Sequence, residues 1–311
     1  MHILFTGGSS FTGFWFVKTL ADAGHTITAP LFHSLNEYKG TRKRRVELLK
    51  SYSEIIENCS FGSKDFLKVI DSKERWDLIC HHAADVTNYK DSQFDYVKAL
   101  KNNTNNINSV IQHLNKKGCH KILLTGSVFE QNEGKGSENL RAASPYGLSK
   151  GLTSDVFKYY ADIHGFHLGK FVIPNPFGPY EEERFTSFLV KTWIENKVAK
   201  ISHPSYVRDN IHISLLAKAY SAFALKLDKP YQQINPSGYI ESQGNFAERF
   251  AKEMRERLNL PCQIEKLEQQ DFTEPKTRYN TTILNLEDLR WEEASAWDEL
   301  AQYYKTKHNL Q

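Results

Sequence analysis

The amino-acid sequence predicts an α/β protein in which a doubly wound parallel sheet is followed by a smaller mixed α/β C-terminal lobe. Three observations support this prediction. Short apolar runs alternate with longer amphipathic segments through the first half of the chain, a glycine-rich turn follows the first of these runs, and a proline-rich loop begins at residue 174. Strands that alternate with helices in this way form a parallel sheet covered by helices on both faces, with right-handed crossovers.

The predicted elements follow from the spacing of apolar residues. Short apolar runs indicate buried strands, which we expect at residues 3–5, 25–32, 77–83, 121–125 and 168–173. Apolar side chains at helical spacing indicate helices, which we expect at 11–23, within 91–114, and at 146–164, 186–196, 215–225, 245–258 and 296–305. We therefore divide the chain into a Rossmann-type domain at 1–173 and a C-terminal lobe at 174–311, with some lobe segments returning to the first domain.

Composition and charge describe an ordinary globular protein, with 40% hydrophobic and 25% charged residues. A net charge of +3 is too small to predict a nucleic-acid or membrane partner. No apolar stretch reaches the ~18 residues that cross a membrane, and the N-terminus lacks the features of a signal peptide, so we expect a cytoplasmic protein. The four cysteines form no CxxC pair, so no metal site is expected. The basic run at 42–45 is expected to be a solvated helix face.

A glycine-rich turn at residues 6–13, Thr-Gly-Gly-Ser-Ser-Phe-Thr-Gly, follows the first strand and opens the first helix. Backbone N–H groups and the helix dipole at such a turn suit a dinucleotide pyrophosphate. Gly7 suits the tight turn, Gly13 allows close helix–strand packing, and Ser10 replaces the usual middle glycine although serine tolerates a positive φ poorly. The alternative is a plain strand–helix connection. The residues of this turn expected to contact the cofactor are Gly7, Ser9, Ser10, Phe11, Thr12 and Gly13.

The end of the second predicted strand, residues 29–34, contains no carboxylate. An acidic residue there normally binds the ribose hydroxyls of NAD and would repel the 2′-phosphate of NADP. Its absence, together with His33, Ser34 and the basic run that follows, favours NADP as the cofactor. NAD stays the alternative, because neutral strand ends also occur in proteins that bind NAD.

Tyr146 and Lys150 lie four residues apart at the start of a predicted helix, so their side chains share one face. A free tyrosine, with a pKa of about 10, is a poor base, and a neighbouring ammonium group stabilises its phenolate. This pair alone is common on helix surfaces. Ser127 makes it specific, because it follows the predicted strand 121–125 and therefore lies at the sheet edge where ligands bind. These three residues are the candidate proton-transfer group.

Four further motifs occur in order along the chain: His-His-Ala-Ala at 81–84, Asn-Pro-Phe-Gly-Pro at 175–179, Val-Arg-Asp-Asn-Ile-His-Ile at 207–213 and Ile-Asn-Pro-Ser-Gly at 234–238. With the glycine turn and the Ser/Tyr/Lys group, they make the chain resemble the extended short-chain dehydrogenase/reductase superfamily. The resemblance is to the NAD-dependent epimerase/dehydratase family in particular, whose members act on nucleotide sugars, and it extends nearly from end to end.

The resemblance implies an enzyme with a nucleotide-sugar substrate and further site residues. Ala83 and Ala84 would lie beside the cofactor, and Lys150 would also hold the nicotinamide ribose. Asn175 would bind the sugar or the diphosphate, and Arg208 would pair with the diphosphate unless it forms a salt bridge to Asp209 or another carboxylate. A homodimer through the helices that include 146–164 is the family's usual assembly. A looser match adds a second phosphate ligand, Arg278.

Several positions depart from the family pattern. Val172 stands where an arginine is usual, and Leu100 stands where an asparagine is expected. Val128 and Phe129 replace the Asp-Glu pair of the family's dehydratases, which disfavours a dehydratase. Two reactions remain: a 4-ketoreductase that uses NADPH, which the missing acid favours, and a 4-epimerase that keeps NAD bound. A non-catalytic cofactor-sensing or scaffold role is less favoured, because the tyrosine and the lysine are both present.

Overall fold

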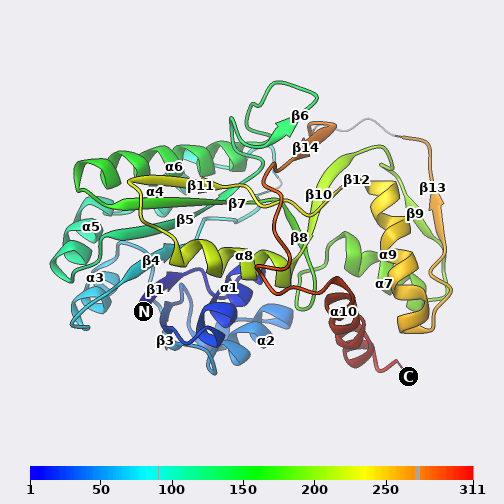
Figure 1. The fold of residues 1–311 in the computed structure, drawn as a ribbon, viewed down its shortest axis with the longest axis horizontal. Coiled ribbons are helices and arrows are strands. Elements are labelled where there is room, and N and C mark those ends of the chain that lie inside the picture. The colour runs from blue at the N-terminus through cyan, green and yellow to red at the C-terminus, as the bar shows by residue number, and fades with distance from the viewer. Residues whose placement is uncertain (90, 270–273, 311) are drawn as a thin grey trace.

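The computed structural model describes residues 1–89, 91–269 and 274–310, and its largest element is a seven-stranded parallel sheet (Figure 1). The strand order is β11-β7-β5-β4-β1-β2-β3, and every neighbouring pair is parallel. This confirms the predicted doubly wound α/β fold. The strands are β1 (His2–Thr6), β2 (Thr26–Pro30), β3 (Glu54–Ile56), β4 (Leu78–His81), β5 (Lys121–Ser127), β7 (His167–Ile173) and β11 (Tyr231–Ile234).

Helices cover both faces of this sheet and enclose one apolar core on each side (Figure 1). On one side Phe16 of α1 stacks on Tyr220 of α8, with ring centroids 3.9 Å apart. On the other side Phe157 of α6 packs among apolar residues of α3 and α5. The helices of the first side are α1 (Phe11–Asp22), α2 (Gly40–Leu49) and α8 (Ile213–Leu225), and those of the second are α3 (Lys64–Asp71), α4 (Tyr96–Asn103), α5 (Ile107–Lys116) and α6 (Pro145–Ile163).

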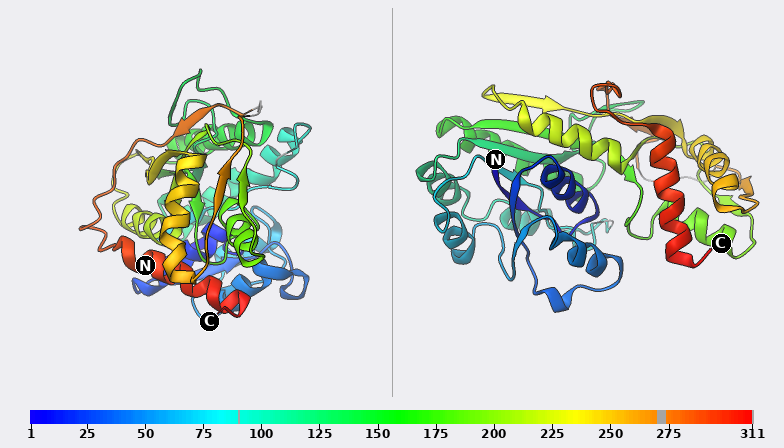
Figure 2. Two further views of the ribbon diagram at one scale, coloured as in Figure 1. Left: turned by 90° about the vertical axis from the view of Figure 1, so that its right-hand side faces the viewer. Right: turned by 60° about the horizontal axis from the view of Figure 1, so that its bottom comes forward.

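The C-terminal lobe has its own aromatic core, in which Trp193, Phe250 and Trp297 are buried. Three helices surround this core, α7 (Phe185–Ile194), α9 (Gln243–Leu258) and α10 (Glu293–His308), and Figure 2 shows them at one end of the molecule. A small sheet joins the lobe to the large sheet. Its strands are β6 (Lys135–Gly136), β8 (Asn175–Phe177), β10 (Val207–His212), β12 (Tyr239–Ser242) and β14 (Thr277–Tyr279), and a separate pair consists of β9 (Ala199–Ile201) and β13 (Ile264–Lys266).

Two segments beyond residue 173 return to the large sheet. β11 adds the seventh strand beside β7, and α8 packs against α1. The expected helix within 91–114 is divided into α4 and α5, because Asn106 adopts a left-handed conformation with φ 52° between them. The short elements β3, α3 and the 3₁₀ helix Leu35–Glu37 had no prediction, and α2 was expected only as the helix face that carries the basic run at 42–45.

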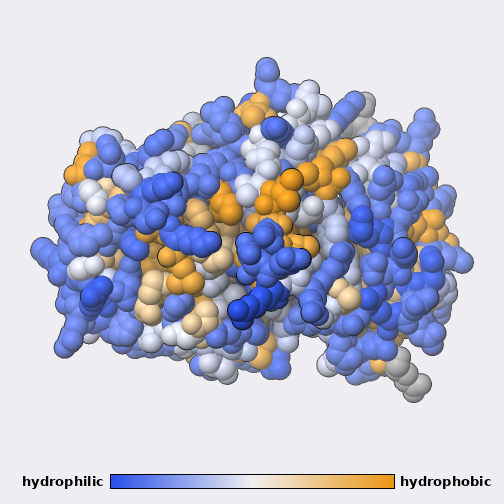
Figure 3. Space-filling view, viewed as in Figure 1, coloured by the Kyte–Doolittle hydropathy of each residue, from blue (hydrophilic) through white to orange (hydrophobic). Residues whose placement is uncertain are grey.

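The surface is that of an ordinary globular protein. Hydrophilic residues cover most of the face shown in Figure 3, and hydrophobic residues form small separate patches. Among the described residues, no helix has both the length and the apolar character needed to cross a membrane. All four cysteines are buried free thiols.

Candidate active site

The glycine-rich turn brings β1 and β4 together at the carboxyl edge of the sheet. Gly7 has a φ of +80°, and a Cβ atom there would lie 2.7 Å from the backbone nitrogen of Ala83. A Cβ atom at Gly13 would lie 2.2 Å from the carbonyl oxygen of Gly7. Both positions therefore require glycine. Ser10, by contrast, has a φ of −72° and caps α1 by accepting a hydrogen bond from the Gly13 N–H. The expected conflict between serine and a positive φ does not arise.

The neutral imidazole of His82 links the turn to β5. Its Nε2 lies 3.0 Å from the hydroxyls of both Ser10 and Thr12, and its Nδ1 lies 2.9 Å from the Thr125 hydroxyl. Burial, reinforced by the charge of Lys150, lowers the pKa of His82 to about 3. The ring therefore stays uncharged at neutral pH and fixes the turn relative to the strand that carries Ser127.

The donors at this turn fit a dinucleotide. The first backbone N–H groups of a helix have no intrahelical carbonyl partner, so those of Phe11 and Thr12 are suited to a pyrophosphate. The Ala83 N–H donates to the Thr6 hydroxyl, and the backbone from there to Ala84 forms the wall opposite Gly7. Within the described ranges, no group of three or more His, Cys, Asp or Glu residues could hold a metal ion.

A single exposed arginine adds a positive charge beside the turn. Arg42 donates from Nε and Nη2 to the Ser9 hydroxyl, at 3.2 and 2.8 Å, and its guanidinium lies 5.3 Å from the centre of the Tyr38 ring. At the nearby end of β2, His33 Nδ1 lies 3.3 Å from a carboxylate oxygen of Glu37. The sequence showed the basic run, but only the fold shows that Arg42 is its exposed member that contacts the turn.

Arg45 corrects the prediction that the basic run is a solvated helix face. Its side chain is completely buried. It donates to the carbonyl oxygens of Ser9 and Tyr180, at 3.1 and 2.7 Å, and it forms an ion pair with Glu182. The partners of this buried guanidinium lie on the turn and on the loop after β8. Arg45 therefore ties these two segments together.

Ser127, Tyr146 and Lys150 come from the end of β5 and the start of α6. Ser144 caps α6 by accepting from the Gly147 N–H, and Pro145 occupies its first position. The absence of a side chain at Gly147 lets the helix approach the Phe129 carbonyl oxygen, which a Cβ would meet at 2.3 Å. The segment just after Ser127 therefore lies directly against the helix that carries the tyrosine and the lysine.

The surroundings of the tyrosine and the lysine disfavour charge. The Tyr146 ring lies between those of Tyr89 and Phe94, with centroids 5.4 and 5.9 Å away. Burial raises the pKa of the Tyr146 hydroxyl, and the Glu130 carboxylate acts in the same direction. Burial also lowers the pKa of the Lys150 ammonium, whose Nζ donates to the Thr125 carbonyl oxygen at 2.5 Å.

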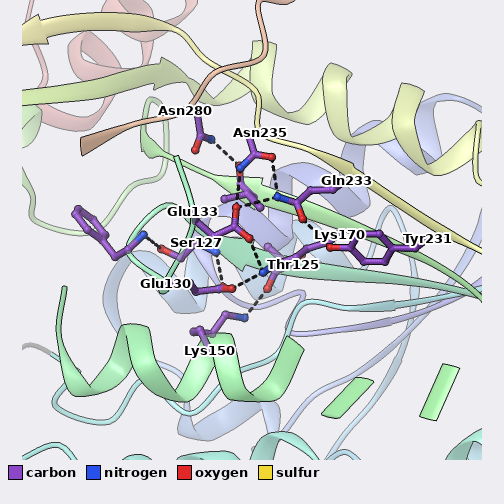
Figure 4. A network of polar contacts seen from close by, with 12 residues as sticks. Thr125, Ser127, Glu130, Glu133, Lys150, Lys170, Tyr231, Gln233, Asn235 and Asn280 are labelled. Atoms are coloured by element: carbon purple, nitrogen blue, oxygen red, sulfur yellow. Dashed lines mark hydrogen bonds and ion pairs between the residues drawn. The ribbon is translucent and has the colours of Figure 1, made fainter. Parts of the chain in front are cut away.

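A buried ion network behind Ser127 was not predicted (Figure 4). The Ser127 N–H donates to Glu130 Oε1 at 2.7 Å. Lys170 Nζ lies 2.7 Å from a carboxylate oxygen of Glu130 and 2.7 Å from one of Glu133. The amides of Gln233 and Asn235 donate to Glu133 at 2.8 Å each. These residues come from three neighbouring strands and one loop, so no local sequence pattern indicates their convergence.

Asn175 and the two candidate phosphate ligands lie on the small sheet. Asn175 begins β8, two residues beyond Ile173, which is the register partner of Ser127. Arg208 and Arg278 are register partners on β10 and β14, so their positive charges lie side by side.

The two arginines have different partners. Arg208 pairs with Glu274 at 3.0 Å, whereas Asp209 accepts from the N–H groups of Gly238 and Asn280. The salt-bridge partner of Arg208 is therefore Glu274 and not the adjacent Asp209. Arg278 is buried and donates from its terminal nitrogens to the carbonyl oxygens of Glu133 and Arg141.

A buried asparagine lies one turn from the position where it was expected. Asn103, rather than Leu100, points from α4 into the structure, donates to the Thr153 hydroxyl at 3.2 Å and accepts from the Asp85 N–H at 2.8 Å. The main-chain carbonyl oxygen of Asn103 lies 3.1 Å from His81 Nε2. Two adjacent asparagines end α4, and the periodicity of this short helix does not indicate which one faces inward.

Comparison with known families agrees with this geometry. The sheet order and the glycine turn are those of a Rossmann-type dinucleotide-binding fold. Residues 3–235 match the NAD dependent epimerase/dehydratase family, so the chain belongs to this family of nucleotide-sugar enzymes. No curated protein matches the sequence.

Three solved structures illustrate the shared fold. The chain is 18% identical to a UDP-glucose 4-epimerase from Thermotoga maritima, with a TM-score of 0.75, and the match covers 99% of this chain and 100% of that one. A UDP-glucuronic acid 4-epimerase from Bacillus cereus, solved with UDP-glucuronic acid and NAD, is 16% identical with a TM-score of 0.72, and the match covers 99% of this chain and 100% of that one. A dTDP-glucose 4,6-dehydratase from Streptomyces venezuelae, solved with NAD, is 14% identical with a TM-score of 0.72, and the match covers 99% of this chain and 98% of that one. Identities this low support the fold alone.

The buried contacts of Arg45 predict a large loss of stability when the guanidinium is removed. Arg45→Met should lower the free energy of unfolding by about 3 kcal/mol, because it leaves two carbonyl oxygens and a carboxylate without their donor. Urea denaturation measures this difference. Arg44→Met is the matched control, since Arg44 is exposed and should change stability by less than about 0.5 kcal/mol. Equal effects of the two substitutions would contradict the role given to Arg45.

Proposed function

We propose that this enzyme reduces the 4-keto group of a nucleotide sugar with NADPH. The observation that carries the choice of cofactor and direction is Arg42 held beside the glycine turn, together with the lack of a carboxylate in residues 29–34 at the end of β2, where Glu37 instead pairs with His33. A guanidinium there suits the 2′-phosphate of NADP. NADPH supplies a hydride when it is bound, and a reductase uses one such cofactor for each product molecule.

Tyr146 is the proposed proton donor. As the keto carbon is reduced, its oxygen gains negative charge, and the Tyr146 hydroxyl transfers its proton to that oxygen. The Ser127 hydroxyl orients the same oxygen by a hydrogen bond. The Lys150 ammonium stabilises the phenolate left on Tyr146 until a proton from solvent restores the hydroxyl. The neighbouring Tyr89 and Phe94 rings limit the access of water to the reacting atoms.

We assign the nucleotide-sugar diphosphate to Arg208 with Asn175 nearby. The guanidinium of Arg208 lies 5.7 Å from the centre of the Phe129 ring, two residues beyond Ser127, so it is close to the proposed reaction centre. Its partner Glu274 is 44% exposed and can therefore give way to a phosphate. Arg278 adds positive charge from the adjacent strand, while its carbonyl contacts hold the loop that contains Glu133.

A nucleotide-sugar 4-epimerase with bound NAD is the second candidate. It is favoured by the structural similarity to 4-epimerases that act on UDP-glucose and UDP-glucuronic acid. A 4-epimerase would use the same three residues but would leave the cofactor unchanged after each turnover. The two candidates therefore differ in cofactor consumption.

The reductase proposal predicts one oxidised cofactor for each product. Incubation with NADPH and a panel of nucleotide-linked 4-keto sugars should give stoichiometric loss of absorbance at the NADPH wavelength and a product reduced once. Tyr146→Phe should lower kcat by about 10²–10⁴-fold, because the proton donor is removed. Tyr159→Phe is the matched control, since Tyr159 is an exposed tyrosine on the same helix. Interconversion of 4-hydroxy sugars with no net cofactor change would instead establish the epimerase.

The cofactor proposal predicts that Arg42→Ala weakens NADPH selectively. The dissociation constant for NADPH should rise by about tenfold or more and that for NADH should change much less, because only NADPH carries the 2′-phosphate proposed to bind the guanidinium. Fluorescence titration of the two reduced cofactors measures both values. Lys43→Ala, the exposed neighbour, should change neither. Tighter binding of NADH than NADPH by the unmodified protein would overturn the NADP assignment.

We also propose a homodimer formed through α4 and α6. These two helices pack together, and each carries exposed apolar side chains, Tyr96 and Val97 on α4 and Tyr159 and Ile163 on α6. Ile163→Glu should shift the protein from dimer to monomer in sedimentation velocity, because it places a charge in the interface. Ile283→Glu, at an exposed apolar residue outside these helices, should leave the dimer intact. A monomeric unmodified protein at micromolar concentration would exclude the proposal.

A further inference from the structure

We propose that Glu130 is a positioning residue that fixes Ser127 and sets the charge beside Tyr146 and Lys150, and that Lys170 balances Glu130. The proposal uses the proposed reduction for its kinetic readout. It rests on three buried charged side chains, Glu130, Glu133 and Lys170, which lie directly behind the candidate catalytic group. We call these three residues the ion triad.

The first part of the argument is geometric. Glu130 Oε1 accepts a 2.7 Å hydrogen bond from the backbone N–H of Ser127, so the carboxylate closes a short loop at the end of β5. A Cβ atom at Gly126 would lie 3.1 Å from Glu130 Oε1 and 2.8 Å from Lys170 Cε. The glycine between Thr125 and Ser127 therefore gives the triad room to pack against the strand.

The second part concerns charge. The carboxylate of Glu130 is within electrostatic reach of both candidate proton-transfer groups, since it raises the pKa of Tyr146 and of Lys150. Burial raises the pKa of Glu130 itself, whereas Lys170 favours its ionised form. Although burial opposes the charge on Lys170, its two carboxylate partners raise the pKa of the ammonium group overall. Glu130 is therefore a carboxylate paired with Lys170 and not an unpaired acid.

The other charged groups around the pair must be counted as well. Besides Glu130, Tyr146 faces Tyr89 and Arg184, and Arg184 lowers the pKa of its hydroxyl. Lys150 is opposed by Lys170. His81 lies close to Lys150, but burial lowers the pKa of His81 to about 3, so it carries no charge at neutral pH. His82 is neutral for the same reason. Glu130 is thus the anionic side chain common to both groups.

A structural role alone does not account for the triad. Buried ion pairs are often no more stabilising than apolar residues of the same volume, because the desolvation of the charges offsets their attraction. The specific geometry of this cluster is instead suited to holding one backbone N–H and one fixed charge. Gln233 and Asn235 complete it by donating to Glu133, which leaves Glu130 oriented toward Ser127.

The test uses the whole chain and two substitutions that remove the negative charge of Glu130, one directly and one through Lys170. Glu130→Gln keeps an acceptor for the Ser127 N–H but removes the negative charge, which lowers the pKa of Tyr146. The alkaline limb of kcat/KM for keto reduction, which requires the protonated tyrosine, should move to lower pH by about 0.5–1 unit. Lys170→Met removes the cation that favours the ionised form of Glu130, so the buried carboxylate should take up a proton and this limb should also move to lower pH. Lys170→Arg should restore the original profile.

Controls separate this effect from general destabilisation. The double variant Glu130→Gln/Lys170→Met tests whether Lys170 acts through Glu130, and Glu130→Gln alone keeps the proposal testable where loss of Lys170, which also pairs with Glu133, prevents folding. Its limb should lie below that of the unmodified enzyme, as for Glu130→Gln alone. Asp298→Asn removes a remote partner of Arg257 and should shift nothing. KM for the cofactor should stay unchanged in all these variants. An unchanged limb in Glu130→Gln, or a limb in the double variant that lies well below that of Glu130→Gln alone, would overturn the proposal.

Hydrogen exchange gives a readout that needs no substrate. Amide exchange in the peptide covering residues 124–130 should be faster by about tenfold in Glu130→Ala, which removes the acceptor of the Ser127 N–H, and nearly unchanged in Glu130→Gln. If the unmodified protein reduced no nucleotide-linked 4-keto sugar, the proposed function would be contradicted. The exchange pattern would still show whether Glu130 positions Ser127. Equal protection in all three proteins would exclude it.

Discussion

The close approach of the backbone at Gly7 to the backbone at Ala83 is the constraint on which the candidate site depends. A side chain at residue 7 would collide with the nitrogen of Ala83, and one at residue 13 would collide with the carbonyl oxygen of Gly7. Because these contacts are between backbones, no rotamer change could relieve them. The turn, the start of α1 and the end of β4 must therefore form one rigid unit, and His82 extends that unit to β5 through Thr125.

Buried charges hold the outer parts of the site to this unit. Arg45 connects the turn to the loop after β8, and Lys170 connects the segment after Ser127 to β7. Both cations are fully paired, as charges removed from water must be. In each case the ionic contacts tie a loop to a helix or strand of the first domain. The substrate side and the cofactor side of the site are therefore held together by polar contacts and not by the apolar cores alone.

The sequence predicted the parts of this arrangement that depend on local spacing. The glycine turn, the Tyr146–Lys150 pair and the serine at a strand end are short patterns whose geometry follows from a single turn, helix or strand. The parts that it did not predict depend on distant partners. Arg45 contacts a carbonyl 135 residues away, and Glu133 pairs with a lysine 37 residues away. A charged residue in a polar helix or loop has the same sequence pattern whether it is solvated or buried, so only the fold distinguishes them.

The electrostatics of the site bear on the direction of the reaction. An epimerase needs Tyr146 first as a phenolate that accepts a proton and then as a phenol that returns it. A reductase that starts from a keto sugar needs only the phenol. Burial and the Glu130 carboxylate both favour the phenol. This preference for the phenol, together with the proposed role of Arg42 in NADP binding, is the electrostatic argument for proposing a reductase over an epimerase.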